Sequence, residues 1–452
     1  MISDAAIAAM RAREEARFIA ANPKSKAAVS TGWFQGVPFH WMLDWPSPFP
    51  LVAAHASGAT LTTVDGNMLD DFCLGDTASM FGHSPLALAQ ALAEQAGQGL
   101  SYMLPTQKGA ELGDMLSQMF GLPKWQVTTT ASEANRAVIR WCRGITKRDK
   151  ILIFNGCYHG AVDDVFVDLR GGIAVNRPSL IGQVQDILPT TVVVEFNDLA
   201  ALEEALRSGD IACVLAEPMM TNIGMVRDAP RYLPALRTLC DETGTLLVFD
   251  ETHTISSGYG GHSNAHGPMP DIMVIGKSIG GGVPCAVYGF TDDVAARMTA
   301  LNRSRPAGHS GIGTTLSANA LSIAAMHAVL GQVITQSAYA HMLAKARYLV
   351  EGLETVIAMH GLDWHVTNVG ARVEFVCAPT PPVNGSEARA AMHHALESTI
   401  HLYLNNRGIL LAPFHNMMLL SSVTTTEQVD RLLNALGKCV AELQETIHDK
   451  TR

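Results

Sequence analysis

The sequence predicts an α/β fold in which helices cover both faces of a mostly parallel central sheet. Short, uniformly apolar runs recur through the middle of the chain, and helical patterns separate several of them. A strand without polar alternation needs cover on both faces, and a helix between two strands supplies the crossover that a parallel pair requires. The chain has 452 residues, which at about 150 residues per domain allows two or three domains.

The N-terminal part is predicted to begin with a helix over about 3–22. Ser3 is a typical N-cap residue, and Pro23 stands where the helix should end. An aromatic loop over 33–50 follows. After this loop we expect a strand pair over about 60–72, turned by Asp65-Gly66.

The central part, 75–325, is predicted to be the large domain. Its expected helices span 132–146, 199–207 and 232–242. Its expected strands span 126–130, 151–154, 191–195, 212–216, 245–250, 272–275 and 285–290.

The C-terminal part, 326–452, is predicted to form a smaller α+β domain together with the N-terminal segment, 1–74. Long helical patterns cover 317–333 and 338–360. A final helix is expected to begin at a capping box formed by Thr424 and Glu427 and to run to Ile447.

Composition narrows the class of protein and of partner. Charged residues are 16% of the chain, against about 25% in typical globular proteins, and 48% of the residues are hydrophobic. This balance predicts a large core and an apolar subunit interface. The net charge of −10 argues against nucleic acid and anionic membrane surfaces as partners, because both attract basic patches.

The cysteines and the apolar runs bear on the cellular compartment. The eight cysteines are dispersed, without the close pairs of metal or redox sites. No run approaches the ~18 apolar residues of a membrane span, and the N-terminal pattern lacks the apolar stretch of a signal peptide. We expect a cytoplasmic protein with reduced cysteines and no metal site.

Lys277 is the leading candidate for a reactive residue. Ligands of open parallel sheets bind beyond the carboxyl ends of the strands, and Lys277 follows the predicted strand 272–275 directly after Gly276. In a desolvated pocket the neutral amine of a lysine attacks a carbonyl and forms a Schiff base. The nearby glycines Gly280, Gly281 and Gly282 alone would suggest a nucleotide phosphate, but their spacing from Lys277 fits no P-loop.

Asp250 ends another apolar run. A buried carboxylate is costly unless it meets a positive partner or strong donors. A protonated ring nitrogen of a cofactor is one such partner, and a structural salt bridge is the alternative. Metal binding by Asp250 and His253 is only weakly indicated, because no second pair with ligand spacing lies nearby.

Two further segments complete a recognisable set of parts. Ala131 and Ser132 open a predicted helix, whose unpaired backbone N–H groups attract a phosphate; an ordinary serine N-cap is the alternative. Tyr158, between Gly156 and Gly160, presents a ring that would stack on a planar ligand or would simply pack in its loop. Lysine, aspartate, stacking ring and helix start are together the parts that a pyridoxal phosphate site requires.

The same residues belong to a series of short motifs that extends from about Thr60 to the C-terminus. The motifs are Val64-Asp65-Gly66-Asn67, Phe81-Gly82-His83-Ser84-Pro85, Ala131-Ser132-Glu133-Ala134-Asn135, Gly156-Cys157-Tyr158-His159-Gly160, Glu217-Pro218, Phe249-Asp250-Glu251, Gly276-Lys277 with Gly280-Gly281-Gly282, and Thr315-Leu316-Ser317-Ala318-Asn319. In this order they resemble the class III aminotransferases, which have pyridoxal phosphate fold type I. Within that family the chain is most similar to the glutamate-1-semialdehyde aminomutase and β-amino acid transaminase branch.

The resemblance implies a role for each catalytic candidate. Lys277 would form a Schiff base with pyridoxal phosphate and later carry the proton between substrate and cofactor. Asp250 would keep the pyridine nitrogen of the cofactor protonated. Tyr158 would stack on one face of the ring.

The resemblance also implies further cofactor contacts and an oligomer. Ala131 and Ser132 would bind the phosphate, and Thr315 of the partner subunit would complete that site. Thr252, where the family usually has Val, would pack on the ring face opposite Tyr158. The remaining predicted contacts are His159 and Glu217, the latter near the phenolic oxygen side of the ring. A site shared in this way implies a homodimer, with a tetramer as the larger alternative.

The predicted substrate side is marked by the aromatic loop. Relatives that act on amino acids often carry an arginine there that clamps a carboxylate, but 33–51 holds no Lys or Arg. The aromatic residues of this loop are Trp33, Phe34, Phe39, Trp41, Trp45 and Phe49. We expect Trp41 and Trp45 to form an apolar wall for a bulky amine, with packing on the partner subunit as the alternative.

Other substrate contacts are less defined by the sequence. His253 follows Thr252 directly and is a third substrate candidate, against the alternative of a core histidine. Arg305 or Arg407 would supply a carboxylate clamp if the substrate is an amino acid.

The sequence therefore predicts a pyridoxal phosphate-dependent aminotransferase. By a ping-pong mechanism it would move an amino group from a bulky or apolar amine or amino acid to a keto acid or another carbonyl acceptor. An intramolecular aminomutase, a racemase or a lyase on the same scaffold is the alternative. A non-catalytic sensor of the same fold is disfavoured, because it would not need both Lys277 and Asp250.

Overall fold

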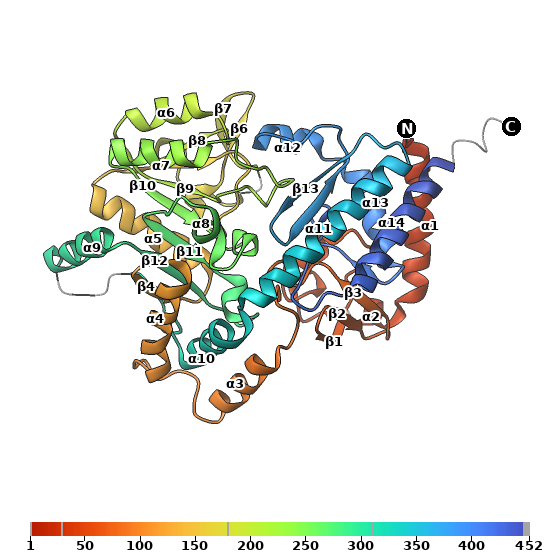
Figure 1. The fold of residues 1–452 in the computed structure, drawn as a ribbon, viewed down its shortest axis with the longest axis horizontal. Helices are drawn as coiled ribbons and strands as arrows, with labels where there is room; N and C mark the ends of the chain where they lie inside the picture. Colours follow the sequence, from red (N-terminus) through yellow and green to blue (C-terminus); the bar gives the residue numbers. More distant parts are fainter. Residues whose placement is uncertain (1, 29, 179, 307, 309–310, 446–452) are drawn as a thin grey trace. The chain divides into compact units, whose positions relative to one another are not determined.

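The computed structural model describes residues 2–28, 30–178, 180–306, 308 and 311–445. The chain forms two compact units (Figure 1). The first consists of Met1–Pro85, Ser337–Pro381 and Ala391–Arg452, and the second of Leu86–Gln336 and Pro382–Ala390. The predicted domain boundaries, 74/75 and 325/326, lie somewhat N-terminal to those of the units.

The second unit is built around a seven-stranded sheet. Its strands, in spatial order, are β4 (Lys124–Thr128), β12 (Ala286–Phe290), β11 (Ile272–Ile275), β10 (Leu246–Asp250), β9 (Ile211–Ala216), β5 (Lys150–Phe154) and β8 (Thr191–Val194). The pairings from β11 to β8 are parallel, and β12 runs antiparallel to both of its neighbours. The predicted mostly parallel sheet is confirmed.

Both faces of this sheet are buried, as the apolar strands require. Ile153, Leu215 and Val248 belong to a core that includes residues of two helices, α5 (Ala131–Thr146) and α9 (Asp292–Ser304). Alternate residues of a strand point to opposite faces. Leu152 and Val214 therefore face the other side, and they too are 0% exposed.

Further helices and a short second sheet complete this unit. The helices α6 (Leu199–Arg207) and α7 (Tyr232–Thr243) contact each other and the sheet at β8 and β10. The remaining elements are α3 (Leu86–Ala96), α4 (Gln107–Phe120), η3 (Asp163–Val165), β6 (Val167–Arg170), β7 (Ile173–Asn176), η4 (Leu188–Thr190), η5 (Thr254–Ser257), α8 (Gly261–His266), η6 (Lys277–Gly280), α10 (Ala320–Ala328), the π-helix η7 (Val329–Val333) and α12 (Gly385–Ala391).

The first unit contains two small sheets and long helices. One sheet has the order β1 (Ala53–Ser57), β2 (Thr60–Thr63), β3 (Met68–Asp71) and β15 (Ile409–Leu410), and the other β13 (His365–Val369), β14 (Arg372–Val376) and β16 (Met417–Leu419). The helices are α1 (Asp4–Ala21), α2 (Pro23–Ala27), α11 (Gln336–Met359), α13 (His394–Asn405) and α14 (Thr426–Glu445). The predicted pair β2 and β3 is confirmed as antiparallel, whereas β1 was not predicted.

Helix ends show where local chemistry was predicted correctly and where it was not. Ser3 caps α1, and its hydroxyl accepts the Ala6 N–H at 3.2 Å. The capping box of α14 lies one residue later than predicted, because Thr425 and Gln428 exchange bonds of 3.0 and 3.3 Å. Thr424 instead accepts the Ser421 N–H. The predicted helix end, Ile447, lies outside the described residues.

One of the two long helical predictions also needs correction. The pattern over 317–333 begins as a helix only at Ala320, with Asn319 as its N-cap, and its last turn is the π-helix η7.

Across the described ranges, no helix combines the length and apolar character needed to cross a membrane.

Candidate active site

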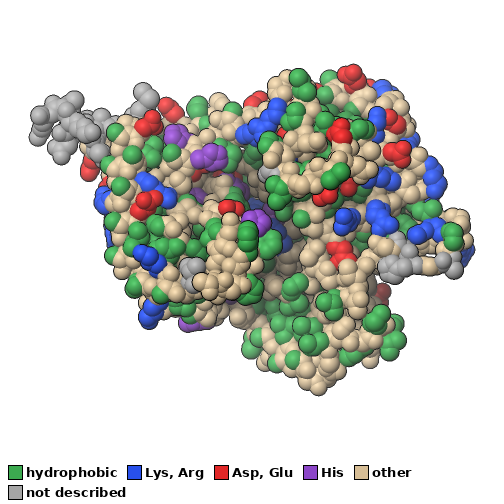
Figure 2. Space-filling view, turned by 180° about the vertical axis from the view of Figure 1, so that it is seen from behind, with side chains coloured by type: hydrophobic (Ala, Val, Ile, Leu, Met, Phe, Trp, Pro, Cys, Tyr) green, Lys and Arg blue, Asp and Glu red, His purple; other side chains and the backbone are tan. Residues whose placement is uncertain are grey.

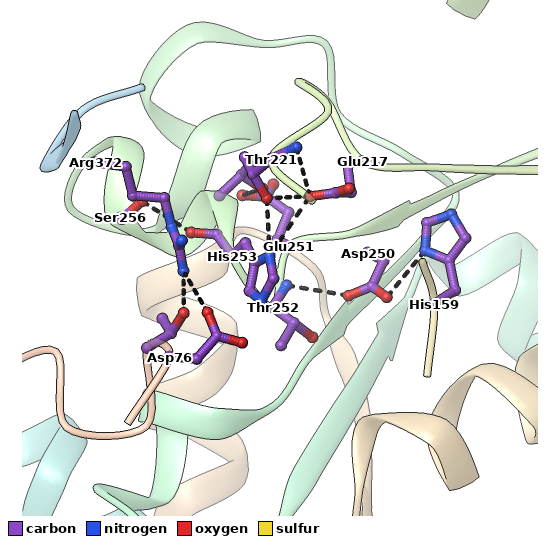
Figure 3. A network of polar contacts seen from close by, with 12 residues as sticks. Asp76, His159, Glu217, Thr221, Asp250, Glu251, Thr252, His253, Ser256 and Arg372 are labelled. Atoms are coloured by element: carbon purple, nitrogen blue, oxygen red, sulfur yellow. Dashed lines mark hydrogen bonds and ion pairs between the residues drawn. The ribbon is translucent and has the colours of Figure 1, made fainter. Parts of the chain in front are cut away.

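The carboxyl ends of neighbouring parallel strands bring several predicted residues of the second unit together. Asp250 is the last residue of β10, and Gly276 and Lys277 directly follow β11. Glu217 follows β9, and the loop after β5 contains Tyr158 and His159. Figure 3 shows the polar contacts that connect the side chains at this edge of the sheet.

Asp250 is buried and firmly held. Its Oδ2 accepts the Asn135 side-chain N–H at 2.8 Å and lies 3.1 Å from His159 Nδ1. Its Oδ1 accepts the Thr252 N–H at 3.1 Å. Burial opposes ionisation, but these contacts, above all that with His159, lower the pKa of Asp250 to about 2. The salt bridge that was the structural alternative is therefore present, and it leaves Asp250 ionised.

His159 is the cation of this pair. Burial alone would lower the pKa of His159, but Cys157 and Asp250 raise it to about 10. Its other ring nitrogen, Nε2, has no hydrogen-bond partner within the described part of the chain. His159 was predicted as a cofactor contact, and its observed contact is to the aspartate.

Lys277 is the first residue of a short 3₁₀ helix and adopts a left-handed backbone, with φ 51°. Its Nζ lies 2.5 Å from His253 Nε2, and the opposite ring nitrogen, His253 Nδ1, lies 2.8 Å from Thr221 Oγ1. Thr221 donates its hydroxyl to Glu217 Oε2 at 2.5 Å. The four side chains form a continuous hydrogen-bonded row, of which Figure 3 labels His253, Thr221 and Glu217.

Glu217 ends this row in a buried position. Burial raises the pKa of Glu217 to about 7, against the opposing effect of the Thr221 hydrogen bond. Its Oε1 has no hydrogen-bond partner among the described residues. Glu217 therefore changes its protonation state near neutral pH.

The start of α5 lies next to the strand end that carries Lys277. A Cβ atom added to Gly276 would lie 2.9 Å from the Ala131 side chain, and one on Gly160 would lie 2.9 Å from Ser132 Cα. Glycine at both positions lets the two loops approach the helix start, where backbone N–H groups favour an anion.

The N-cap of α5 is not Ser132, which the sequence offered as an N-cap only as the alternative to a phosphate-binding residue. Thr130 is the cap, and its hydroxyl accepts the Glu133 N–H at 3.2 Å. The Ser132 hydroxyl accepts the Ala161 N–H at 3.0 Å, so Ser132 is not an ordinary N-cap. Strand β4 ends at Thr128, which leaves two threonines for the turn.

The remaining predicted residues have varied surroundings. Tyr158 is 44% exposed, and Thr315 of this chain is exposed in the loop before α10. The Thr252 hydroxyl accepts the Gly276 N–H at 3.2 Å and so ties β10 to the residue before Lys277. His253 is neither isolated nor a plain core histidine, because its ring contacts both Lys277 and Thr221.

The aromatic loop and Arg407 lie in the first unit. Trp41 and Trp45 line a largely apolar cavity of about 510 Å³ within that unit. Arg407 binds the buried Glu14 at 3.0 Å and stacks on the Tyr403 ring at 3.1 Å. Arg305 is exposed after α9.

Sequence reasoning missed two residues of this site. Asn135 holds Asp250; it ends the motif Ala131-Ser132-Glu133-Ala134-Asn135 but was given no role there. Thr221 joins Glu217 to His253, and no motif marks it. The described residues contain no group of three His, Cys, Asp or Glu side chains arranged to hold a metal ion, and the cysteines are free thiols.

Comparison with known proteins identifies the family. A model of the class-III aminotransferases matches residues 43–440. A glutamate-1-semialdehyde 2,1-aminomutase of Gemmatimonas aurantiaca is 31% identical over 401 residues, which are 87% of this chain and 90% of the relative. The enzyme of the same name from Roseiflexus castenholzii is 33% identical over 369 residues, 80% of this chain and 83% of the relative.

Solved structures agree with this family in fold. A glutamate-1-semialdehyde aminomutase of Pseudomonas aeruginosa is 44% identical, with a TM-score of 0.95 over 98% of this chain and 99% of that one. A second structure under that name, 43% identical, holds PMP. The β-phenylalanine aminotransferase of Variovorax paradoxus is 27% identical, with a TM-score of 0.85 over 96% of this chain and 97% of that one. The fold is that of the fold type I pyridoxal phosphate enzymes, and this chain belongs to the class III aminotransferases, whose cofactor is pyridoxal phosphate.

Proposed function

We propose that Lys277 holds pyridoxal phosphate covalently and that Asp250 keeps its pyridine nitrogen protonated. The observation that carries this proposal is the meeting of a lysine amine and an ionised, buried carboxylate at one edge of the parallel sheet. When bound, the cofactor supplies a carbonyl that captures the substrate amine and a ring that accepts electrons from the reacting carbon. Lys277 then moves the proton at that carbon through its Nζ.

The other predicted residues fit the same group. Ala131 and Ser132 lie at a helix start that suits a phosphate, and Tyr158 and Thr252 would contact the two faces of the ring. His159 acts on the cofactor through Asp250, because its contact with the aspartate stabilises the ionised carboxylate. Glu217 is assigned to the phenolic oxygen side of the ring.

For the reaction itself, we propose an intramolecular transfer of an amino group between adjacent carbons of an amino aldehyde. Support comes from relatives named as glutamate-1-semialdehyde aminomutases, which include the 44% identical protein. This was the alternative of the sequence interpretation rather than its main prediction. An enzyme of this kind is an aminotransferase whose donor and acceptor carbons belong to one molecule.

A transaminase that acts on a bulky amine is the second candidate. It is favoured by the aromatic loop, which lacks Lys and Arg and whose Trp41 and Trp45 line an apolar cavity. We assign these two tryptophans to donor binding in that case. Of the two predicted arginine clamps, Arg407 is already bound to Glu14, so we assign a substrate carboxylate to Arg305.

One comparison separates the two candidates. Purified holoenzyme is incubated with glutamate-1-semialdehyde alone, and the isomeric amino ketone, 5-amino-4-oxopentanoate, is quantified. In parallel, 1-phenylethylamine and β-phenylalanine are offered with pyruvate or 2-oxoglutarate. Catalytic isomerisation supports the aminomutase, and efficient use of the aromatic donors alone supports the transaminase. If neither occurs while the cofactor remains covalently bound, both substrate assignments are wrong.

We also propose a homodimer whose two sites are each completed by Thr315 of the partner subunit. Hydrophobic side chains gather over α3 and the segment after it (Figure 2), where Leu86, Leu100, Met103 and Leu104 are exposed. Exposed apolar patches of this kind mark interfaces. Analytical ultracentrifugation should give a dimer or tetramer, and a monomer that turns over at full rate would contradict the shared site.

A further inference from the structure

His253 stands between two groups that can exchange protons. Its side chain is 11% exposed, and its ring joins Lys277 Nζ at 2.5 Å to Thr221 Oγ1 at 2.8 Å. Thr221 is fully buried and donates its hydroxyl to Glu217 Oε2 at 2.5 Å. The direct separation of His253 Nδ1 from Glu217 Oε2 is 3.9 Å, so the threonine hydroxyl bridges them.

Hydrogen bonding permits two complete arrangements of this row. With Glu217 ionised, Thr221 donates to Glu217, His253 Nδ1–H donates to Thr221, and His253 Nε2 accepts from Lys277. With Glu217 protonated, each bond reverses, and His253 Nε2–H donates to a neutral Lys277 amine. The His253 ring is neutral in both arrangements, and the two arrangements differ in its tautomer.

The two arrangements differ by one proton moved from Lys277 to Glu217. The Nζ–H bond of the lysine breaks and a bond to His253 Nε2 forms, while the Nδ1 proton passes to Thr221 and the hydroxyl proton of Thr221 passes to Glu217. No oxidant or other reactant is needed. Lys277 must lose a proton before its amine attacks a carbonyl, and Glu217 is an acceptor for that proton within the protein.

The charged surroundings make Glu217 the acceptor rather than Asp250. Asp250 from β10 is held ionised by His159 from the loop after β5, whereas burial raises the pKa of Glu217 to about 7. The Asp250 charge raises the pKa of Glu217 further, and the His159 charge lowers it. Glu217 thus takes up a proton in the pH range where enzymes commonly work.

We propose that His253 and Thr221 conduct a proton between Lys277 Nζ and Glu217 Oε2, and that this transfer activates Lys277. This inference rests on the proposed role of Lys277 as the residue that binds the cofactor. His253 contacts the reacting nitrogen, whereas Thr221 and Glu217 act through it. His253 is a substrate candidate in the sequence, and its contact with Lys277 Nζ supports a role in proton transfer.

The test measures the activation of Lys277 without any substrate. Apoenzyme is mixed with pyridoxal phosphate in a stopped-flow instrument, and covalent attachment is followed by visible absorbance from pH 6 to pH 10. His253→Gln keeps a donor and an acceptor but cannot pass a proton on, and Thr221→Val removes the bridging hydroxyl. Each variant should attach the cofactor at least about 100-fold more slowly at pH 7, the lower range of general acid–base effects.

The defect should have the signature of a missing proton acceptor. It should shrink as pH rises, because solvent then deprotonates the amine, and imidazole should accelerate attachment to His253→Ala. Thr221→Ser should restore the rate. His262→Gln, which changes a buried histidine of the same unit, should behave as wild type.

Binding of pyridoxamine phosphate, whose amine cannot react with the lysine, separates activation from loss of the pocket. Its affinity should be retained in His253→Gln and Thr221→Val. Attachment at the wild-type rate in either variant, or equal losses of attachment and of pyridoxamine phosphate affinity, would overturn the proton path. If Lys277→Ala still attached pyridoxal phosphate, the proposed function itself would fail, which is a different outcome.

Discussion

At the residue scale, the site separates two buried carboxyl groups by their surroundings. Asp250 is in contact with the Asn135 side chain, the His159 ring and the Thr252 N–H. The pKa of His159 is raised to about 10. Glu217 accepts a hydrogen bond from the Thr221 hydroxyl, lies 3.9 Å from His253 Nδ1, and has its pKa raised by burial to about 7. One carboxylate is thereby suited to a permanent charge and the other to exchange of a proton.

The raised pKa of Glu217 predicts a pH-dependent effect on stability. Between the ordinary value of 4.5 and about 7, the folded apoenzyme keeps a proton that the unfolded chain releases, so this group lowers stability as pH rises. Glu217→Gln removes the titration. We expect the stability of the variant relative to wild type to increase from pH 4.5 to about 7 and then to level off in urea unfolding. A difference that stayed constant with pH would contradict the shift.

Thr252 predicts a local stability effect. Its hydroxyl accepts the buried Gly276 N–H, which Val at this position could not replace. Leaving that N–H without a partner should destabilise the apoenzyme by about 1–3 kcal/mol in Thr252→Val, as measured by urea unfolding. Thr252→Ser keeps the acceptor and should lose clearly less. Equal losses in the two variants would point to packing of the methyl group instead.

At the element scale, neighbouring residues at the start of α5 have different structural roles. Thr130 caps the helix, and Ser132 holds the loop that follows Tyr158 and His159 through the Ala161 N–H. The helix then presents Asn135 to Asp250 from its buried face. A single helix thus orders the proposed phosphate site, the ring-stacking loop and the aspartate.

Two substitutions at this helix start should have different effects. Thr130→Ala should lower the unfolding free energy of the apoenzyme by about 1 kcal/mol, the usual cost of a lost N-cap. Ser132→Ala should chiefly weaken pyridoxal phosphate affinity, measured as the cofactor concentration that half-saturates the visible absorbance. If Thr130→Ala weakened the cofactor affinity as much as Ser132→Ala, the proposed division would be wrong.

Sequence patterns predicted elements well where burial alone decides them. The strand 272–275 and the helix 199–207 match β11 and α6 residue for residue, because uniform burial or a helical period defines them. Termini were less predictable. Thr130 against Ser132 and Thr425 against Thr424 are choices between nearby capping residues that only the backbone geometry decides.

The site was predictable in its residue types and less so in its contacts. Lys277 and Asp250 follow apolar strands, which the sequence makes visible. The bond between His253 and Lys277, and the bridge through Thr221, depend on how the ends of β9, β10 and β11 meet, and no spacing in the sequence encodes that meeting. The β1 strand was missed because its burial is slight and its sequence lacks an apolar run.

At the scale of the whole molecule, the scarcity of charge has a structural reason. The central sheet of the second unit is buried on both faces, and a second core fills the helices and sheets of the first unit. Apolar residues around α3 are exposed and belong to the proposed subunit interface. Low charge thus accompanies two cores and a proposed subunit interface.

Placement of the cofactor on Lys277 is the central claim, and peptide mapping tests it most directly. The holoenzyme is reduced with borohydride, digested and analysed by mass spectrometry, with Lys277→Ala as the matched control. We predict one modified peptide, carrying the reduced cofactor on Lys277, and loss of both the modification and the visible absorbance in the variant. Modification of a different lysine, or visible absorbance retained with full turnover in Lys277→Ala, would contradict the account.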